Sequence, residues 1–311
     1  MKYRNVGHSG LQISAVSIGG WLTFGGSLDK EATRGILDAA IDAGINFVDL
    51  ADVYSQGKAE KAAGKALARY PRHELVISSK VFGRMSDDVN DRGLSRKHIM
   101  ESVEGSLERL RTEYLDIYFC HRADPSTPLE ETVRAMDDLV HQGKILYWGT
   151  SVWSAGDLSK ASELAEARNL FAPRVEQPQY SLLERDIEKD VLPTCAEHGI
   201  GVVTWSPLAG GALTGKYDDG VPEGSRAATT EWMKEYLSEQ NLPKLREFSG
   251  LARDLGVEPG QLALAWILRR PEIASVITGA TRPEHVASNV QAVDVEVSDE
   301  LARQLDRLFP A

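Results

Sequence analysis

The chain has few of the residues that build metal centres or covalent cross-links. Its 311 residues include two cysteines, Cys120 and Cys195, which are far apart and form no CxxC pair. The sequence contains no HExxH motif and no His/Cys cluster, so metal catalysis has no support. Because free cysteines are usually buried, we expect two inert thiols in a reducing compartment.

Long apolar runs and an excess of positive charge are also absent. No segment is apolar over the roughly 20 residues needed to cross a bilayer, and the N-terminus lacks the apolar stretch of a signal peptide. We therefore expect a cytoplasmic protein without membrane insertion. The formal net charge of −11 argues against broad binding to nucleic acid. A local cationic pocket for phosphate is compatible with this charge, because such a site needs only a few residues.

The sequence has no turn of the form Gly-x-Gly-x-x-Gly between a strand and a helix, so a Rossmann domain is not supported. Residues 210–216, Gly-Gly-Ala-Leu-Thr-Gly-Lys, match the opening of a phosphate-binding P-loop. However, Tyr217 follows where a magnesium-binding Ser or Thr is required, and residues 218–222 are typical of a turn rather than a helix. A P-loop nucleotide hydrolase is therefore disfavoured.

Short β-branched runs alternate with longer segments of helical periodicity almost from end to end. The runs predict strands at residues 15–19, 46–50, 75–79, 115–120, 145–149, 174–177, 201–205 and 275–278. The periodic segments predict helices at residues 30–43, 58–68, 96–111, 129–142, 155–167, 187–198, 259–269 and 283–293. Eight such units without a break in composition predict one α/β domain over residues 1–311, a (β/α)8 TIM barrel.

Three segments lie outside the eightfold pattern. Residues 2–13 hold Gly7-His8-Ser9-Gly10 between short apolar stretches, which predicts a β-hairpin plugging one end of the barrel. Residues 207–237 form a long connection, and connections of that length tend to be lids or binding loops. Residues 298–308 predict an extra C-terminal helix with Ser298 as its N-cap.

The predicted strand ends carry a chemically coherent set of side chains. Barrel enzymes place their active sites at the C-terminal ends of their strands. Asp49 and Tyr54 lie at and after the end of the second predicted strand, Lys80 ends the third and His121 ends the fourth. Each has an ordinary structural explanation by itself, but residues at successive strand ends converge on one rim. We therefore treat the four as one candidate site.

Together these four residues suit the reduction of a carbonyl group. The carbonyl oxygen gains negative charge as hydride arrives at carbon, and it then needs a proton. The phenol of Tyr54 is a poor acid near neutral pH, but a close ammonium such as Lys80 is expected to lower its pKa. Asp49 would hold that ammonium in place, and a neutral His121 can donate a hydrogen bond to the same oxygen.

This pattern resembles the aldo-keto reductase family over essentially the whole chain. The motifs that carry the resemblance are Asp49-x-x-x-x-Tyr54, Lys80, His121 and Gly57-Lys58-Ala59-Glu60. Residues 20–26, 205–209 and 215–217 are most similar to the branch that contains voltage-gated potassium-channel β subunits and their bacterial relatives. The resemblance implies NADPH-dependent reduction of aldehydes or ketones to alcohols, with the proton supplied by Tyr54.

The resemblance also implies a cofactor site for NADP(H) across the barrel mouth, covered by residues 207–237. Ser151 and Gln177 would bind the nicotinamide carboxamide, and Thr281 and Arg282 would favour NADPH by binding its 2′-phosphate. The full implied set is Gly20, Trp21, Asp49, Ser151, Gln177, Trp205, Ser206, Pro207, Leu208, Ala209, Gly210, Gly211, Lys216, Arg226, Gly279, Thr281, Arg282, His285, Ser288 and Asn289. An aromatic-walled pocket for a small carbonyl substrate is expected from Trp21, Tyr54, Phe82, His121 and Trp153.

Some positions depart from the channel-subunit pattern. Val152 stands where those subunits have Arg, while Gly224, His285 and Ser288 replace Tyr, Gln and Glu. These changes leave the cofactor class intact and alter the expected tightness of binding. Channel subunits also carry Asn at the position of His121, whereas typical reductases carry His, and this difference favours an active enzyme.

Two other functions fit part of the same pattern. Lys80 could form a Schiff base with a carbonyl substrate while Asp49 and Tyr54 shuttle protons, and borohydride trapping without nicotinamide would identify that chemistry. A redox-sensing module that holds NADPH and regulates a partner, with little turnover, is the other alternative. The sequence is also compatible with a homo-oligomer.

Overall fold

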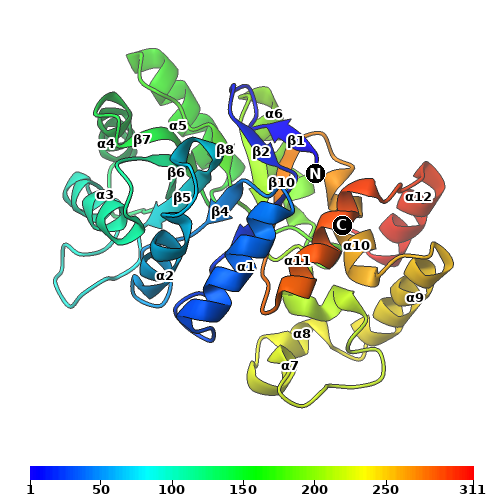
Figure 1. Ribbon diagram of the computed structural model, residues 1–311. Coiled ribbons are helices and arrows are strands. Elements are labelled where there is room, and N and C mark those ends of the chain that lie inside the picture. Colours follow the sequence, from blue (N-terminus) through cyan, green and yellow to red (C-terminus); the bar gives the residue numbers. More distant parts are fainter.

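The computed structural model describes residues 1–311, and its centre is a closed barrel of eight parallel strands (Figure 1). The strands follow the chain order around the barrel, and the last pairs with the first. They are β3 (Val16–Gly19), β4 (Phe47–Asp49), β5 (Val76–Val81), β6 (Leu115–Cys120), β7 (Ile145–Thr150), β8 (Val175–Glu176), β9 (Gly201–Thr204) and β10 (Ile273–Thr278). The predicted (β/α)8 barrel is confirmed.

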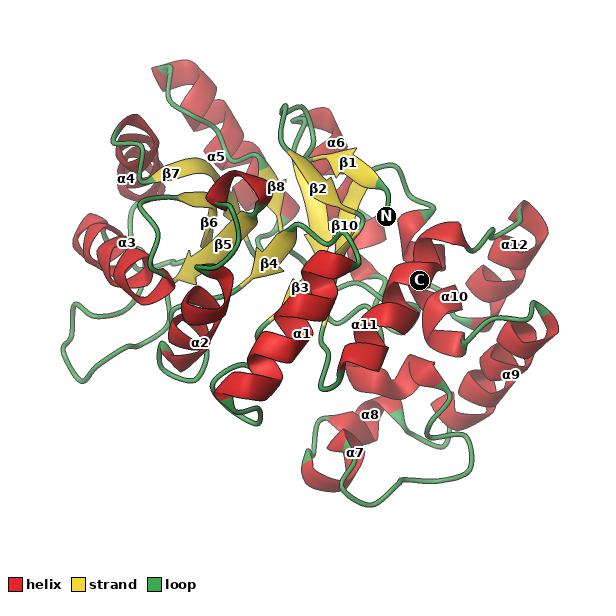
Figure 2. Cartoon of the chain, viewed as in Figure 1, coloured by secondary structure: helices red, strands yellow, loops and turns green.

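Helices surround the strands on the outside of the barrel (Figure 2). The helices that complete the eightfold pattern are α1 (Lys30–Asp42), α2 (Lys58–Leu67), α3 (Arg96–Leu110), α4 (Leu129–His141), α5 (Ala155–Arg168), α6 (Val191–Glu197), α10 (Pro259–Leu268) and α11 (Pro283–Val290). The additional α-helices are α7 (Arg226–Thr229), α8 (Met233–Tyr236), α9 (Asn241–Asp254) and α12 (Asp299–Leu308). Short 3-10 helices are η1 (Arg72–Glu74), η2 (Asp186–Glu188), η3 (Ala209–Thr214) and η4 (Gln291–Asp294).

The strands bury side chains on both faces, because the barrel has two apolar layers. An inner cluster fills the barrel and includes Phe47, Ile117 and Val203. An outer cluster of 64 buried residues packs the strands against the helices. Strands covered on both sides consist of nearly continuous apolar residues. This explains why β6, which is buried throughout, was predicted with its observed bounds.

The N-terminal hairpin closes the barrel at the end where the strands begin. Its strands β1 (Tyr3–Asn5) and β2 (Gln12–Ser14) pair antiparallel, and the adjoining Val6 joins the inner core. Gly7 has φ +52°, and a Cβ on it would lie 2.3 Å from the carbonyl oxygen of Gly199. Only glycine fits this approach without displacing the backbone. The predicted hairpin plug is confirmed.

The long connection after β9 contains more regular structure than the sequence indicated. Residues 207–237 include η3, α7 and α8 instead of forming an extended loop. Met233 is buried, and the Tyr236 hydroxyl accepts from Gln179 and donates to Glu184. These contacts fasten the segment to the barrel.

Helix α9 was not predicted from the sequence. Pro243 and Gly250 resemble helix breakers, but Pro243 lies in the first turn, where proline is tolerated. The helix buries Leu245, Phe248 and Ala252, which share one helical face. Its stability therefore depends on packing that local propensity does not reveal.

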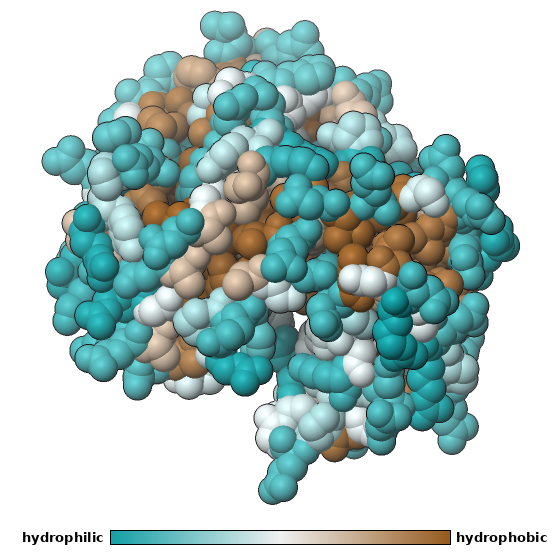
Figure 3. All heavy atoms as spheres, turned by 45° about the vertical axis from the view of Figure 1, so that its right-hand side comes forward, coloured by the Kyte–Doolittle hydropathy of each residue, from teal (hydrophilic) through white to brown (hydrophobic).

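The hairpin and the α7–α8 segment lie at opposite ends of the molecule (Figure 1). In the space-filling view the segment belongs to a mainly hydrophilic lower lobe, which a notch separates from the body (Figure 3). Because α7 and α8 follow the C-terminal end of β9, this lobe stands at the end of the barrel where the strands finish. The candidate site lies at the same end.

Candidate active site

Asp49, Lys80 and Tyr54 form a contiguous hydrogen-bonded group at the ends of β4 and β5. The ammonium of Lys80 lies 2.6 Å from Asp49 Oδ2 and donates to the Tyr54 hydroxyl at 3.0 Å. It also donates to the carbonyl of Leu50 at 2.7 Å. Each of its three protons therefore has an acceptor. Lys80 is fully buried and Asp49 nearly so, which makes the complete pairing of their charges necessary.

A second set of contacts holds the carboxylate of Asp49. Its Oδ1 accepts from Ser78 Oγ at 2.8 Å and from Gln177 Nε2 at 2.9 Å. Ser78 was not predicted as a site residue, although its position contained a signal. It precedes Lys80 by two residues, so both side chains face the same side of β5. Asp49, Tyr54 and Lys80 are called the acid cluster below. Ser78 helps to hold this cluster in place by donating to Asp49.

Burial shifts the pKa values of Tyr54 and Lys80. Burial raises the pKa of Tyr54 and the Lys80 ammonium lowers it, and burial prevails, so the pKa lies above its ordinary value. Burial lowers the pKa of Lys80, but the charges of Asp49 and Tyr54 outweigh it and raise that pKa overall. Lys80 lowers the pKa of Tyr54 as expected, but the desolvation of the phenolate, which was not considered, outweighs it. The resting cluster thus holds a neutral phenol beside a charged ammonium.

His121 follows β6 and faces the same opening. Its ring centroid lies 5.8 Å from that of Tyr54 at an interplanar angle of 73°. Burial and the charges of Lys80 and Arg122 lower the pKa of His121 to about 2, so the imidazole is neutral. Tyr54 and His121 are partly exposed, whereas Asp49 and Lys80 are sealed beneath them. A carbonyl at the opening would meet two neutral hydrogen-bond donors.

Arg122 is a site residue that the sequence reasoning missed. Its Nη1 donates to the carbonyl of His121 and approaches Ser151 Oγ at 3.5 Å. The guanidinium therefore bridges the ends of β6 and β7. Its charge lowers the pKa of both Tyr54 and His121. The available signal was its position directly after a predicted catalytic residue at a strand end.

The predicted substrate-pocket residues do not all meet. Trp21 is 43% exposed and stacks edge-to-face on Trp205, with centroids 6.5 Å apart. Trp153 is 4% exposed and packs in the outer core, while its backbone N–H donates to the buried carboxyl of Glu176. The Trp153 side chain is therefore almost fully buried, whereas that of Trp21 is open to solvent. Tyr54 and His121 meet directly.

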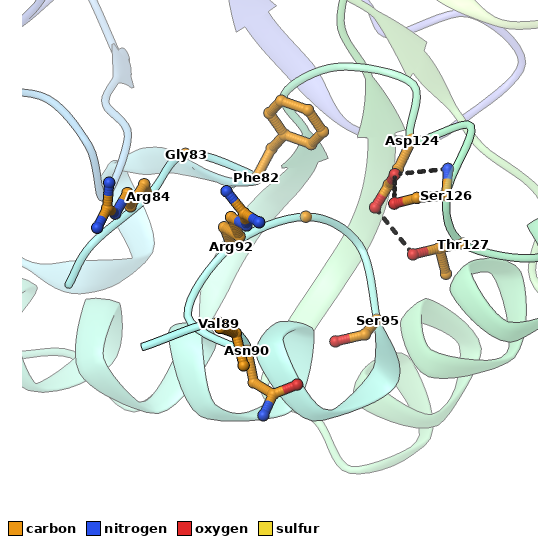
Figure 4. A pocket seen from close by; sticks show the side chains of 11 residues that line it. Phe82, Gly83, Arg84, Val89, Asn90, Arg92, Ser95, Asp124, Ser126 and Thr127 are labelled. Carbon is orange, nitrogen blue, oxygen red and sulfur yellow. Dashed lines mark hydrogen bonds between the residues drawn. The ribbon is translucent and has the colours of Figure 1, made fainter. Parts of the chain in front are cut away.

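Phe82 lines a cavity of about 570 Å³ between the loops that follow β5 and β6 (Figure 4). The wall includes Asp124, whose carboxylate accepts from the side chains of Ser126 and Thr127. Tyr54, Lys80 and His121 do not line this cavity. The acid cluster lies outside it, and Phe82 is the one predicted pocket residue that lines it.

The two residues predicted to bind a carboxamide lie beside the acid cluster. Ser151 and Gln177 follow β7 and β8, and Ser151 Oγ donates to the backbone carbonyl of Gln177 at 2.8 Å. Because the Gln177 amide also donates to Asp49, it links this position to the proton-donating group. A nicotinamide ring whose carboxamide contacts Ser151 and Gln177 would therefore lie next to Tyr54.

The segment after β9 has an unusual backbone. Ser206 and Ala209 have φ +52° and +47°, and Gly210 and Gly211 also have positive φ. Gly210 has φ +65°, and a Cβ on it would lie 2.8 Å from the Trp232 ring, so another residue would be strained there. Left-handed non-glycine residues cost free energy and concentrate at binding sites. Successive residues of this kind can turn backbone N–H groups toward an anion.

Cations without acidic partners lie around this segment. Lys216, Arg226 and Arg282 have no carboxylate within 4.0 Å, although the chain has 46 acidic residues and 35 basic ones. Burial lowers the pKa of Arg226. Arg282 Nη2 lies 3.1 Å from a ring nitrogen of His285, whose pKa is lowered by burial and by the charges of Arg282 and Lys216. These groups form a cationic surface on an acidic protein.

The other predicted cofactor residues divide between the two sides of the opening. Gly20 is buried at the end of β3. Gly279 and Thr281 are exposed after β10, and Ser288 and Asn289 lie on α11. The carbonyl of Ser288 accepts from Gln261 at 3.2 Å. The predicted set therefore extends from the acid cluster to the cationic surface.

Both cysteines are free and buried. No group of three or more His, Cys, Asp or Glu side chains is placed to hold a metal ion. None of the helices combines the length and the apolar composition that crossing a membrane requires.

Comparison with known proteins gives matches over nearly the whole chain. Residues 15–309 match the sequence model of the aldo/keto reductase family. The chain is 44% identical to a protein of Schizosaccharomyces pombe, over 99% of this chain and 93% of that protein. It is 46% identical to a protein of Arabidopsis thaliana and 44% identical to one of Oryza sativa subsp. japonica, each over 95% of this chain and 92% of the relative. All three are named voltage-gated potassium channel subunit beta, as provisional assignments.

Proposed function

Because the chain belongs to the aldo/keto reductase family, we propose that it reduces aldehydes or ketones to alcohols with NADPH and with Tyr54 as proton donor. The family is one of oxidoreductases that generally use NAD(P)H. One observation carries the proposal for this chain: the Tyr54 hydroxyl lies 3.0 Å from the Lys80 ammonium, which is itself paired with Asp49 at 2.6 Å. Such a group can release a proton and stabilise the anion that remains.

NADPH supplies the hydride when it is bound. Tyr54 and neutral His121 donate hydrogen bonds to the carbonyl oxygen, and Tyr54 transfers its proton as negative charge develops there. The Lys80 ammonium then stabilises the tyrosinate, and Asp49 keeps that ammonium charged and oriented. The high resting pKa of Tyr54 keeps the phenol protonated between turnovers, and the adjacent ammonium acts mainly when the proton leaves.

The cationic surface supports the choice of a phosphate-bearing cofactor. In this proposal Ser151 and Gln177 bind the carboxamide, and the residues from Trp205 to Gly211 run beside the pyrophosphate. Lys216 and Arg226 bind phosphate, while Thr281 and Arg282 bind the 2′-phosphate. An anion would pair cations that have no acidic partner in the chain, and binding would relieve the cost of leaving Arg226 partly buried.

The direct test is oxidation of NADPH, followed by its absorbance, with a panel of aromatic and aliphatic aldehydes. We expect turnover that depends on both aldehyde and protein, with NADPH preferred over NADH. If the protein binds NADPH but oxidises it with no aldehyde or ketone, the enzymatic proposal fails. If NADH serves equally well, the assignment of the 2′-phosphate site fails separately.

A second function is favoured by the names of the relatives, which are called channel subunits. In that case the protein would hold NADPH and act as a redox-sensing regulatory module with little turnover. This second function predicts that the purified protein retains NADPH through gel filtration and does not oxidise it when an aldehyde is added. The same assay therefore separates the two functions.

A further inference from the structure

Arg122 is a partly buried cation at the opening of the acid cluster, and no carboxylate neutralises it. Its only hydrogen bonds run from Nη1, to the carbonyl of His121 and, at 3.5 Å, to Ser151 Oγ. It has no carboxylate within 4.0 Å. The function proposed above gives Arg122 no part in proton transfer or in cofactor binding. The charge of Arg122 acts on Tyr54 and His121, but two of its guanidinium nitrogens have no partner next to the reacting centre.

The charges around Arg122 make the opening positive. Lys80 and Asp49 form a buried pair and cancel one another. His121 is neutral, and burial raises the pKa of Glu176, the acid behind the neighbouring loop, to about 7. The chain as a whole has a net charge of −11. A positive centre in an acidic protein favours small anions at the opening over the rest of the surface.

The free part of the guanidinium has a specific shape. Because Nη1 makes both contacts to the protein, Nε and Nη2 remain as a pair of donors on one edge of the plane. Two parallel N–H groups of this kind match the two oxygens of a carboxylate. The carbonyl of His121 and the side chain of Ser151 hold the third nitrogen, so little side-chain entropy remains to be lost when an anion binds.

We propose that Arg122 binds a carboxylate on the substrate, and that the protein prefers aldehydes or ketones that carry a carboxylate near the carbonyl group. This inference rests on the proposed reductase function and names its substrate class. Arg122 lies between His121, which would bind the reacting carbonyl, and Ser151, which would bind the cofactor. A carboxylate held there places the carbonyl of the same small molecule at Tyr54. The substrate carboxylate would pair with Nε and Nη2 of Arg122, which have no partner within the chain.

The experiment compares each aldehyde acid with its own neutral methyl ester, for three lengths: glyoxylate, succinic semialdehyde and 4-carboxybenzaldehyde. We expect the acid to exceed its ester in kcat/KM by at least tenfold for the best length, because only the acid can form the charge-assisted bidentate pair. The difference should lie mainly in KM. Acids and esters used equally well at all three lengths would overturn the proposal.

Variants then test whether Arg122 causes the preference. Arg122→Met should bring the acid-to-ester ratio close to one, and Arg122→Lys should retain part of it as a point charge without the fork. The ratio is the readout because loss of Arg122 also raises the pKa of Tyr54 further, which affects both substrates alike. The matched control is Arg134→Met on α4, which removes an exposed arginine paired with Glu130 and should leave the ratio unchanged. An undiminished ratio in Arg122→Met would refute the assignment.

Two further outcomes are informative. If Arg122→Met weakens NADPH binding, measured by fluorescence titration, and lowers acid and ester turnover equally, the guanidinium serves the cofactor and the substrate proposal is wrong. If neither acids nor neutral esters and aldehydes are reduced by the unaltered protein, the reductase function itself has failed. A protein that reduces neutral aldehydes without preferring acids contradicts only the role of Arg122.

Discussion

The two sides of the barrel mouth differ in how completely the chain satisfies its own charges. At the ends of β4 and β5, Lys80 and Asp49 are buried, and every proton of the ammonium has an acceptor within the chain. After β9 and β10, Lys216, Arg226 and Arg282 have no acidic partner. The backbone after β9 adopts left-handed conformations at Ser206, Ala209 and the two glycines that follow. The charges on the first side are paired within the chain, whereas the cations on the second side would be paired by the bound anion proposed above.

This difference corresponds to the tasks proposed for each side. Proton transfer depends on positions that change little between turnovers, which a fully bonded buried cluster provides. Cofactor exchange requires a surface that can release its ligand, and unpaired, partly exposed cations can do so. At the barrel mouth, the acid cluster thus pairs its buried charges within the chain, whereas the cations after β9 and β10 would gain a partner from the proposed cofactor.

Tyr54→Phe should produce the largest effect, because it removes the proton donor and leaves the other buried contacts in place. We expect kcat to fall by about 10²–10⁴-fold, the usual contribution of a general acid. The Kd for NADPH should remain nearly unchanged, because the ring is kept. Stopped-flow reduction and a fluorescence titration measure the two quantities. Equal activity in the variant would remove Tyr54 from its assigned role.

At the ends of β4 and β5, the cost of burying a carboxylate should also make the stability of the protein depend on pH. Asp52 is fully buried, its Oδ2 accepts from Ser102 at 2.9 Å, and burial raises its pKa to about 7. A carboxyl whose pKa is raised in the folded protein lowers the free energy of unfolding as the pH rises. The loss begins near pH 4, the pKa of the carboxyl in the unfolded chain, and ends once the pH has passed the pKa in the folded protein. Between pH 5 and pH 8 this loss is on the order of 2 kcal/mol for one such group.

Asp52→Asn should flatten that slope, since the amide does not ionise and its oxygen can still accept from Ser102. The measurement is the free energy of urea unfolding at several pH values, taken as the difference between variant and unaltered protein. The control is Asp299→Asn in the exposed first turn of α12, which should leave the slope as it is. A parallel pair of curves for Asp52→Asn would mean that the carboxyl is ionised without cost in the folded protein.

On the open side, Arg282→Met should weaken NADPH binding by about tenfold, which corresponds to 1.4 kcal/mol. Because Arg282 is assigned to the 2′-phosphate, the affinity for NADH should hardly change. Arg303→Met, which removes an exposed arginine on α12, is the matched control. Equal weakening of both cofactors would place Arg282 at a phosphate that they share.

The barrel and the identity of its acid cluster could be predicted because both depend on local patterns. Strand β6 consists of continuously buried residues, and its predicted bounds match the observed ones. Asp49, Lys80 and His121 could be aligned because parallel strands end on one rim. In contrast, α9 depends on tertiary packing of Leu245 and Phe248, and its proline and glycine obscured the helical pattern.

The features of the site that could not be predicted from the sequence depend on burial and on contacts made in the folded protein. The direction of the pKa of Tyr54 follows from the balance between desolvation and the Lys80 charge, and sequence reveals only the second. The sequence does not reveal that Trp153 is almost fully buried in the outer cluster whereas Trp21 is exposed. The free edge of Arg122 follows from where its Nη1 is held, which no spacing in the sequence indicates.

The smallest effect is expected at Val152, on the border between the two sides. It is 45% exposed and has φ +57°, an unfavourable conformation for a β-branched residue. Channel subunits that resemble this chain have arginine there. Val152→Arg should therefore tighten NADPH binding by about threefold, since an exposed ion pair contributes below about 1 kcal/mol.

The matched control is Val152→Met, which removes the β-branch without adding charge. We expect it to raise the melting temperature slightly through relief of backbone strain and to leave the NADPH affinity unchanged. If methionine tightens NADPH binding as much as arginine does, the gain comes from the relaxed loop and not from a new cation. The phosphate side would then be limited by its backbone conformation, and its unpaired cations would already suffice for the ligand.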